Sequence, residues 1–215
     1  MASLMDKQAR IETMMRAAPV IPVVVIDEPK SAVALARALV AGGIPAIEIT
    51  LRTARAMDCL RAVAAEVEGA IAGAGTVLSR TQIGQVEKAG AKFMVSPGAS
   101  PRLLDAAEDS PVPLLPGAAT PSEMMALAER GYRHLKFFPA EQAGGSSYLK
   151  ALASPLQQMR FCPTGGITPD LAPRYLALAN VLCVGGSWLA PAEKIAKADW
   201  SGITALARNA AKLQG

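Results

Sequence analysis

The segment His134-Leu-Lys-Phe-Phe-Pro139 gives the first indication of how this chain folds. A run of apolar and aromatic residues that ends at a proline is typical of a buried strand. Lys136 lies in the middle of this run, although lysine is almost never buried without a partner or a task. A desolvated ammonium loses its proton more readily than a free one, and a neutral buried amine can form a Schiff base with a carbonyl substrate. The structural alternative is a lysine that reaches solvent or pairs with a carboxylate.

Short apolar runs recur along the chain at intervals of about 20 to 25 residues, with helical segments between them. Proline opens several of these helices, and glycine closes others. Strands that alternate with helices form a parallel sheet, so eight such units in 215 residues predict an α/β protein with a (β/α)8 TIM barrel. The predicted strands are 20–26, 46–50, 70–75, 92–96, 112–115, 134–138, 159–164 and 181–184, and the predicted helices include 30–41, 54–67, 81–89, 101–108, 121–130 and 169–178.

An additional N-terminal helix is predicted over residues 6–18, with an apolar stripe at Ile11, Met14, Met15 and Ala18. This helix could close the floor of the barrel or pack on its side. No linker or low-complexity segment divides the chain, so residues 1–215 are expected to form a single domain. An open doubly wound sheet is the alternative architecture, and it is disfavoured because no Gly-x-Gly-x-x-Gly motif follows the first strand.

Side chains alternate along a strand, so one parity faces the barrel axis and the other faces the helices. The apolar side chains of Ile47 and Ile49 are expected to face the helices, so Glu48 between them is expected to face the axis. By the same alternation, Leu135 and Phe137 face the helices and Lys136 faces the axis. The second and sixth strands lie opposite each other, near the carboxyl ends where barrel active sites are found. An isolated carboxylate and amine predict an acid–base pair, with a structural ion pair as the alternative.

Two glycine-rich turns follow the last two predicted strands. They are Thr164-Gly165-Gly166 and Gly185-Gly186-Ser187. Barrels often bind phosphate at this position through backbone N–H groups, and glycine lets the backbone approach the anion. The position of the two turns therefore predicts a phosphate-bearing substrate.

For other residues at the predicted mouth of the barrel, the sequence gives weaker evidence of a functional role. Arg52 could hold a carboxylate bidentately, Pro97 marks a rigid turn, and Phe138 shares the parity of Lys136 and can shelter it. His134 is the only histidine, and its deeper position on that face predicts a core residue. With one histidine and no cluster of carboxylates, neither a metal site nor another cofactor is predicted.

Composition limits the partners and the compartment. The net charge is +4, but the basic residues are scattered, so a nucleic-acid partner is not expected. No apolar stretch is long enough to span a bilayer and no secretory hydrophobic core opens the chain, so a cytoplasmic protein is expected. Cys59, Cys162 and Cys183 lack metal spacing and are predicted to be free buried thiols.

Taken together, several segments resemble the 2-keto-3-deoxy-6-phosphogluconate (KDPG) aldolase / 4-hydroxy-2-oxoglutarate aldolase family, and they follow the family's order over nearly the whole chain. Pro45 and the segment Leu115-Pro-Gly-Ala-Ala-Thr120 depart from the family's usual residues, without touching the predicted chemistry. The matching segments are Gly42–Thr53, Gly73–Leu78, Val95–Gly98, Lys136–Glu141, Arg160–Ile167 and Cys183–Trp188.

The resemblance implies a metal-independent class I aldolase that acts on a small phosphorylated keto acid and assembles as a homotrimer. It implies Lys136 as the Schiff-base lysine and Glu48 as the general acid/base. By the same resemblance, the substrate-binding residues are Arg52 and Thr76 for the carboxylate, Pro97 lining that pocket, Thr164 for a hydroxyl, and Gly165, Gly166, Gly185, Gly186 and Ser187 for the phosphate.

Related galactonate-type aldolases usually have an apolar residue at the position of Thr164, so this threonine favours the gluconate-derived epimer. Two other functions compete with the aldolase. One is an epimerase or isomerase acting on a phosphosugar, which needs the phosphate loops but no iminium at Lys136. The other is a protein that binds sugar acid phosphates without turnover. The barrel alone does not choose among these functions.

Overall fold

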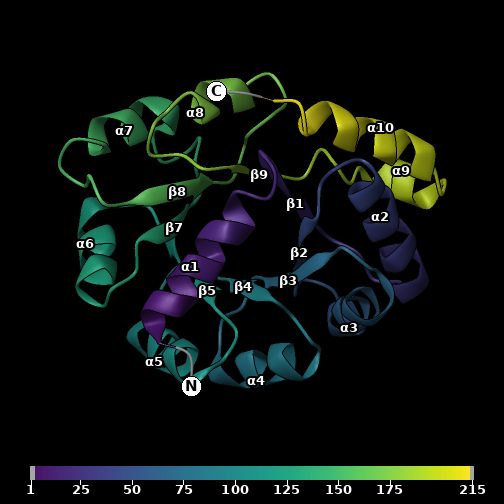
Figure 1. The fold of residues 1–215 in the computed structure, drawn as a ribbon, viewed down its shortest axis with the longest axis horizontal. Helices are drawn as coiled ribbons and strands as arrows, with labels where there is room; N and C mark the ends of the chain where they lie inside the picture. The colour runs from purple at the N-terminus through teal and green to yellow at the C-terminus, as the bar shows by residue number, and fades with distance from the viewer. Residues whose placement is uncertain (1–2, 214–215) are drawn as a thin grey trace.

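The computed structural model describes residues 3–213, which form an α/β fold with a curled parallel sheet surrounded by helices (Figure 1). Its strands are β1 (Val20–Val24), β2 (Ala46–Thr50), β3 (Ile71–Gly75), β4 (Phe93–Val95), β5 (Leu114–Leu115), β6 (Gly117–Ala118), β7 (His134–Phe137), β8 (Arg160–Pro163) and β9 (Val184–Gly186). Its helices are α1 (Leu4–Met15), α2 (Pro29–Ala41), α3 (Ala56–Glu66), α4 (Arg80–Lys88), α5 (Pro101–Asp109), α6 (Pro121–Glu129), α7 (Gly145–Leu152), α8 (Ala172–Leu176), α9 (Ala192–Ala196) and α10 (Trp200–Ala210). No helix among these is long and apolar enough to cross a membrane.

The predicted elements overlap observed ones, and two strands differ most from their predicted bounds. The predicted strand 112–115 is followed after Pro116 by a further strand, β6. Proline donates no N–H to a ladder, which accounts for the interruption. The predicted strand 181–184 begins too early, because β9 starts only at Val184. The start of the predicted strand still contacts the sheet, since Val181 forms an isolated bridge with Phe161.

The strands are paired in two sections rather than in one continuous ladder. The larger section has the order β5-β4-β3-β2-β1-β9, and the smaller has the order β6-β7-β8. The sections approach each other at the isolated bridge Thr164↔Gly185 and at Pro116. The strands therefore form a curled parallel sheet in two sections, and its closure into the predicted eight-strand barrel stays a prediction.

Alternation along the strands separates two apolar clusters. The larger cluster contains Ile47, Ile49, Leu135 and Phe137 on the side that faces the helices, as their parity predicts. The smaller cluster lies on the inner face of the curled sheet. It consists of Ile11, Met14, Met15, Ile21, Ala46, Phe93, Val95, Leu115, Cys162 and Cys183.

Helix α1 covers the amino ends of the strands (Figure 1). Three of its residues belong to the inner cluster, whereas Ala18 lies beyond the helix and joins the outer cluster. The Gln8 side-chain oxygen accepts hydrogen bonds from the backbone N–H groups of Arg133 (2.8 Å) and His134 (3.0 Å) at the start of β7. The sequence left the floor and the side of the sheet as alternatives for this helix, and these contacts place it at the floor.

Candidate active site

Lys136 and Glu48 meet on the inner face of the sheet. The Lys136 Nζ atom lies 3.1 Å from Glu48 Oε1 and 3.4 Å from Oε2. Both side chains are buried, with 6% of Lys136 and 4% of Glu48 exposed. The pair joins β7 to β2, and the ring centroid of Phe138 lies 5.5 Å from the Lys136 amine. An amine and a carboxylate this close in a desolvated site can exchange a proton.

Glycines on β3 make room for the glutamate. Strand β3 pairs with β2 so that Glu48 lies beside Gly73 and Thr50 beside Gly75. A Cβ atom added at Gly75 would lie 2.6 Å from Glu48 Cγ and 2.7 Å from its Cδ. The space that a Cβ atom at Gly73 would need is likewise occupied by the ring of Phe93. A side chain at position 75 would therefore displace the Glu48 carboxylate from the lysine.

A cavity of about 210 Å³ opens beyond this pair at the carboxyl ends of the strands. It brings together eight residues that the sequence identified as candidates. These are Arg52, Phe138, Thr164, Gly165, Gly166, Gly185, Gly186 and Ser187. Arg52 supplies a cation next to the glycine turns, so the cavity combines positive charge with exposed backbone.

The glycine turns have the backbone geometry of an anion site. Gly165 (φ +108°) and Gly166 (φ +77°) both adopt left-handed conformations that glycine tolerates. Within residues 3–213, the backbone N–H of Gly166 donates no hydrogen bond. Gly185 is required for a different reason, because an added Cβ would overlap the Thr164 hydroxyl. Such N–H groups at a glycine turn form a concave surface that suits an anion.

Thr76 and Pro97, like Lys136 and Glu48, are predicted site residues that do not line this cavity. Thr76 directly follows β3 and Pro97 comes two residues after the end of β4, so both lie at the same carboxyl edge as the lysine–glutamate pair. Thr76 has a left-handed backbone (φ +59°), which is uncommon for a β-branched residue. Strain of this kind often occurs at functional sites.

The cavity is also lined by three apolar residues that were not predicted from the sequence, namely Val23, Val25 and Ile167. Val25 is 52% exposed, which is unusual for a large aliphatic side chain. Parity along the first strand could have identified Val23 and Val25, because both share the parity of Ile21, which lies in the inner cluster.

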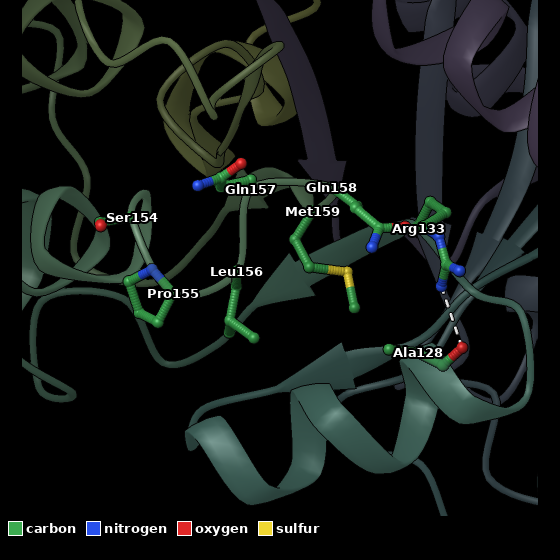
Figure 2. Close-up of a pocket in the computed structure, with 8 residues that line it drawn as sticks. All are labelled: Ala128, Arg133, Ser154, Pro155, Leu156, Gln157, Gln158 and Met159. Carbon is green, nitrogen blue, oxygen red and sulfur yellow. Dashed lines mark hydrogen bonds between the residues drawn. The ribbon is translucent and has the colours of Figure 1, made fainter.

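Larger cavities lie elsewhere on the protein. One of about 320 Å³, shown in Figure 2, is lined by residues that precede β7 and β8, including Arg133 and Met159. The Arg133 guanidinium donates a hydrogen bond to the carbonyl of Ala128 in α6 (2.9 Å). This cavity is at the amino ends of the strands, away from the buried lysine–glutamate pair. The candidate site is therefore assigned from the buried ionisable pair and not from cavity volume.

The three cysteines do not form a second reactive centre. Cys59, Cys162 and Cys183 are buried free thiols, as predicted. Burial and the neighbouring Cys162 raise the pKa of the Cys183 thiol, so it remains protonated and unreactive. Among residues 3–213, no group of three His, Cys, Asp or Glu side chains is arranged to hold a metal ion.

Comparison with known proteins agrees with this geometry. Residues 11–206 match the family model of KDPG and KHG aldolase. The KHG/KDPG aldolase of Escherichia coli is 50% identical over 199 residues, which are 93% of each chain.

Solved structures extend the agreement to three dimensions. A KDPG aldolase from Legionella pneumophila, with pyruvate captured at low pH as a covalent carbinolamine intermediate, is 46% identical with a TM-score of 0.91, covering 94% of this chain and 98% of that one. The 2-keto-3-deoxy-6-phosphogluconate aldolase of Zymomonas mobilis with 3-phosphoglycerate is 47% identical with a TM-score of 0.88, covering 95% and 96%. By its sequence from residue 11 to 206 and by its fold, this chain belongs to the KDPG and KHG aldolase family.

Proposed function

We propose that this protein is a class I aldolase that cleaves 2-dehydro-3-deoxy-6-phospho-D-gluconate to pyruvate and D-glyceraldehyde 3-phosphate. The buried contact between Lys136 and Glu48 is the observation that carries this proposal. Family membership and the covalent pyruvate adduct of the Legionella relative support it. The same pair would cleave 4-hydroxy-2-oxoglutarate to pyruvate and glyoxylate, in keeping with the name of the E. coli relative.

The reaction begins when the neutral amine of Lys136 attacks the C2 ketone of the substrate. The resulting carbinolamine loses water and becomes an iminium, which withdraws electrons from the C3–C4 bond. Glu48 removes the proton of the C4 hydroxyl, the C3–C4 bond breaks, and the aldehyde leaves. Protonation of the enamine at C3 and hydrolysis of the iminium then release pyruvate and regenerate the free lysine.

Substrate binding divides between the two parts of the carboxyl edge. Arg52 and Thr76 hold the substrate carboxylate, with Pro97 lining that pocket. Thr164 contacts a hydroxyl group, and Phe138 shelters the lysine. The N–H groups of the two glycine turns and the hydroxyl of Ser187 bind the phosphate. The lining of the cavity by Arg52 and both turns supports this division.

The chain is further proposed to form one domain with a closed eight-strand barrel. The bridge Thr164↔Gly185 between β8 and β9 and the single residue between β5 and β6 support closure.

The protein is proposed to be a cytoplasmic homotrimer, whose interfaces would cover exposed apolar residues such as Leu78 and Met125. Light scattering on the purified protein tests the trimer, which requires three times the 22.3 kDa mass of one chain.

The decisive experiment is borohydride reduction in the presence of pyruvate, followed by peptide mass spectrometry. The expected result is one reduced pyruvate adduct on Lys136, together with aldol cleavage of the phosphorylated substrate. Lys136→Ala should lose both the adduct and turnover. Lys150→Ala is the matched control, because Lys150 is exposed on α7 and both activities should persist there.

Two outcomes would overturn the proposal. An adduct confined to exposed lysines would show that Lys136 is not the nucleophile. It would favour an epimerase or a protein that binds sugar acid phosphates without turnover. Near-normal turnover in Lys136→Ala would exclude an iminium at this residue altogether.

A further inference from the structure

Glu141 and Tyr175 form a polar pair that the proposed mechanism does not use. The Tyr175 hydroxyl, on α8, donates a hydrogen bond to the Glu141 carboxylate, which follows β7. Tyr175 is 1% exposed. Burial, reinforced by the hydrogen bond with Glu141, raises the pKa of the Tyr175 phenol well above its usual range. The phenol therefore stays protonated and remains a hydrogen-bond donor at any physiological pH.

Glu141 directly contacts the glycine turn at the cavity. Its backbone N–H donates to the carbonyl of Gly165 (3.1 Å), and the preceding N–H of Ala140 donates to the carbonyl of Thr164 (2.8 Å). A Cβ atom added at Gly166 would come within 2.9 Å of both Cβ and Cγ of Glu141. Gly166 therefore packs against the Cβ and Cγ atoms of Glu141.

The first turn of α7 encloses the pair from a third side. Gly145 donates its N–H to the carbonyl of Ala140 (2.9 Å) and has a left-handed φ of +67°. A Cβ atom added at Gly145 would lie 3.5 Å from Glu141 Oε1 and 3.6 Å from the Tyr175 hydroxyl. The hydrogen bond between Tyr175 and Glu141 thus joins α8 to the segment after β7, and the glycine turn lies between β8 and α8 in the sequence.

We propose that Tyr175 and Glu141 are positioning residues that hold the Gly165–Gly166 turn in the conformation that binds the substrate's phosphate. Two adjacent glycines lose much backbone entropy when they are fixed, so a turn held in place before binding gains affinity. Among the described residues, the pair is hydrogen-bonded to the turn and forms no hydrogen bond or ion pair with Lys136 or Glu48, so it acts on phosphate affinity and leaves the bond-breaking step alone. This inference rests on the proposed phosphate site.

The test compares Tyr175→Phe with the wild type on two substrates. For the phosphorylated substrate, KM should rise about tenfold, as expected for the loss of one hydrogen bond to a charged group, with kcat within about twofold. For 4-hydroxy-2-oxoglutarate, which has no phosphate, KM should stay unchanged. Glu141→Gln keeps an oxygen acceptor and should retain most of the wild-type affinity, whereas Glu141→Ala should match Tyr175→Phe.

Tyr148→Phe is the matched control, since the described residues offer the Tyr148 hydroxyl no hydrogen-bond partner and its ring packs on Phe137. Calorimetric binding of D-glyceraldehyde 3-phosphate to each variant gives a readout that does not need turnover. If the wild type cleaves neither substrate, the proposed function fails, and a tenfold weaker binding of this ligand by Tyr175→Phe still supports the inference. Equal affinity in the wild type and Tyr175→Phe, or equal KM changes for both substrates, would overturn it.

Discussion

At the scale of single residues, Gly75 determines where the Glu48 carboxylate lies. Lys136 attracts the carboxylate across the sheet, at 3.1 Å, and the missing side chain of Gly75 leaves the space for it. Removing only one partner of a buried ion pair is strongly destabilising, because the other charge is left uncompensated. A change at Gly75 instead keeps both charges and alters only their geometry.

Gly75→Ala should therefore reduce turnover without abolishing the lysine chemistry. The new Cβ displaces the flexible end of Glu48, so kcat should fall by at least about tenfold, toward the roughly 10²–10⁴-fold contribution of a general acid–base group. The borohydride adduct on Lys136 should still form. Gly84→Ala is the control, because nothing lies within 4 Å of its added Cβ, and this α4 substitution should leave kcat unchanged and stabilise the helix by about 0.5–1 kcal/mol. Wild-type kcat in Gly75→Ala would show that the exact position of the carboxylate is unimportant.

At the scale of elements, α1 completes the inner core at the amino ends of the strands. Ser3 caps this helix and forms a reciprocal capping box with Asp6. Its apolar stripe then enters the inner cluster, and the Lys7 amine donates to the carbonyl of Glu108 at the end of α5 (2.6 Å). The helix is therefore held by its own cap, by apolar burial and by polar contacts to two other elements.

Met15→Ala should destabilise the protein by about 2–5 kcal/mol, the usual range for a buried methionine truncated to alanine. Met15 is 0% exposed, whereas Met5 on the same helix is 79% exposed. Met5→Ala is thus a chemically identical control and should change the free energy of unfolding by no more than about 0.5 kcal/mol. Urea unfolding of the two variants measures the difference. Similar losses in both would mean that α1 does not close the floor.

At the scale of the whole molecule, one histidine links the floor to global stability. His134 is 6% exposed; its Nε2 lies 3.5 Å from Glu12 Oε2, and its Nδ1 lies 3.2 Å from Gln8 Oε1. Burial lowers the pKa of His134 below 6.5, with Arg16 and Arg160 acting in the same direction and Glu12 opposing them. Below pH 6.5 His134 is protonated in the unfolded chain, whereas in the folded protein it becomes protonated only at a lower pH. Stability from this group is therefore fully present above pH 6.5 and decreases as the pH falls toward and through the folded-state pKa.

His134→Gln should remove this dependence. The wild type should lose unfolding free energy between about pH 7.5 and 5.5, a range above the ordinary carboxylate pKa values. The variant should lose less over the same range, because the sequence contains no other histidine. Urea denaturation at the two pH values measures both losses. An unchanged loss in the variant would assign the pH dependence to other groups.

Local patterns predicted much of the fold and the inward direction of the two residues at the centre of the candidate site. The alternation Ile47-Glu48-Ile49 placed Glu48 on the inner face, and Leu135-Lys136-Phe137 did the same for Lys136, because side-chain direction along a strand has a period of two. The bounds of β2 were predicted at both ends. The parallel order of the strands followed from their alternation with helices.

Only the tertiary structure brought distant residues together. It joined Tyr175 to Glu141, placed Ile167 in the cavity lining, set α1 against the floor and divided the strands near Pro116 into two sections. Such contacts depend on how the sheet curls and how each helix packs on it. These are properties of the whole chain, whereas strand and helix periodicity are encoded within a few consecutive residues.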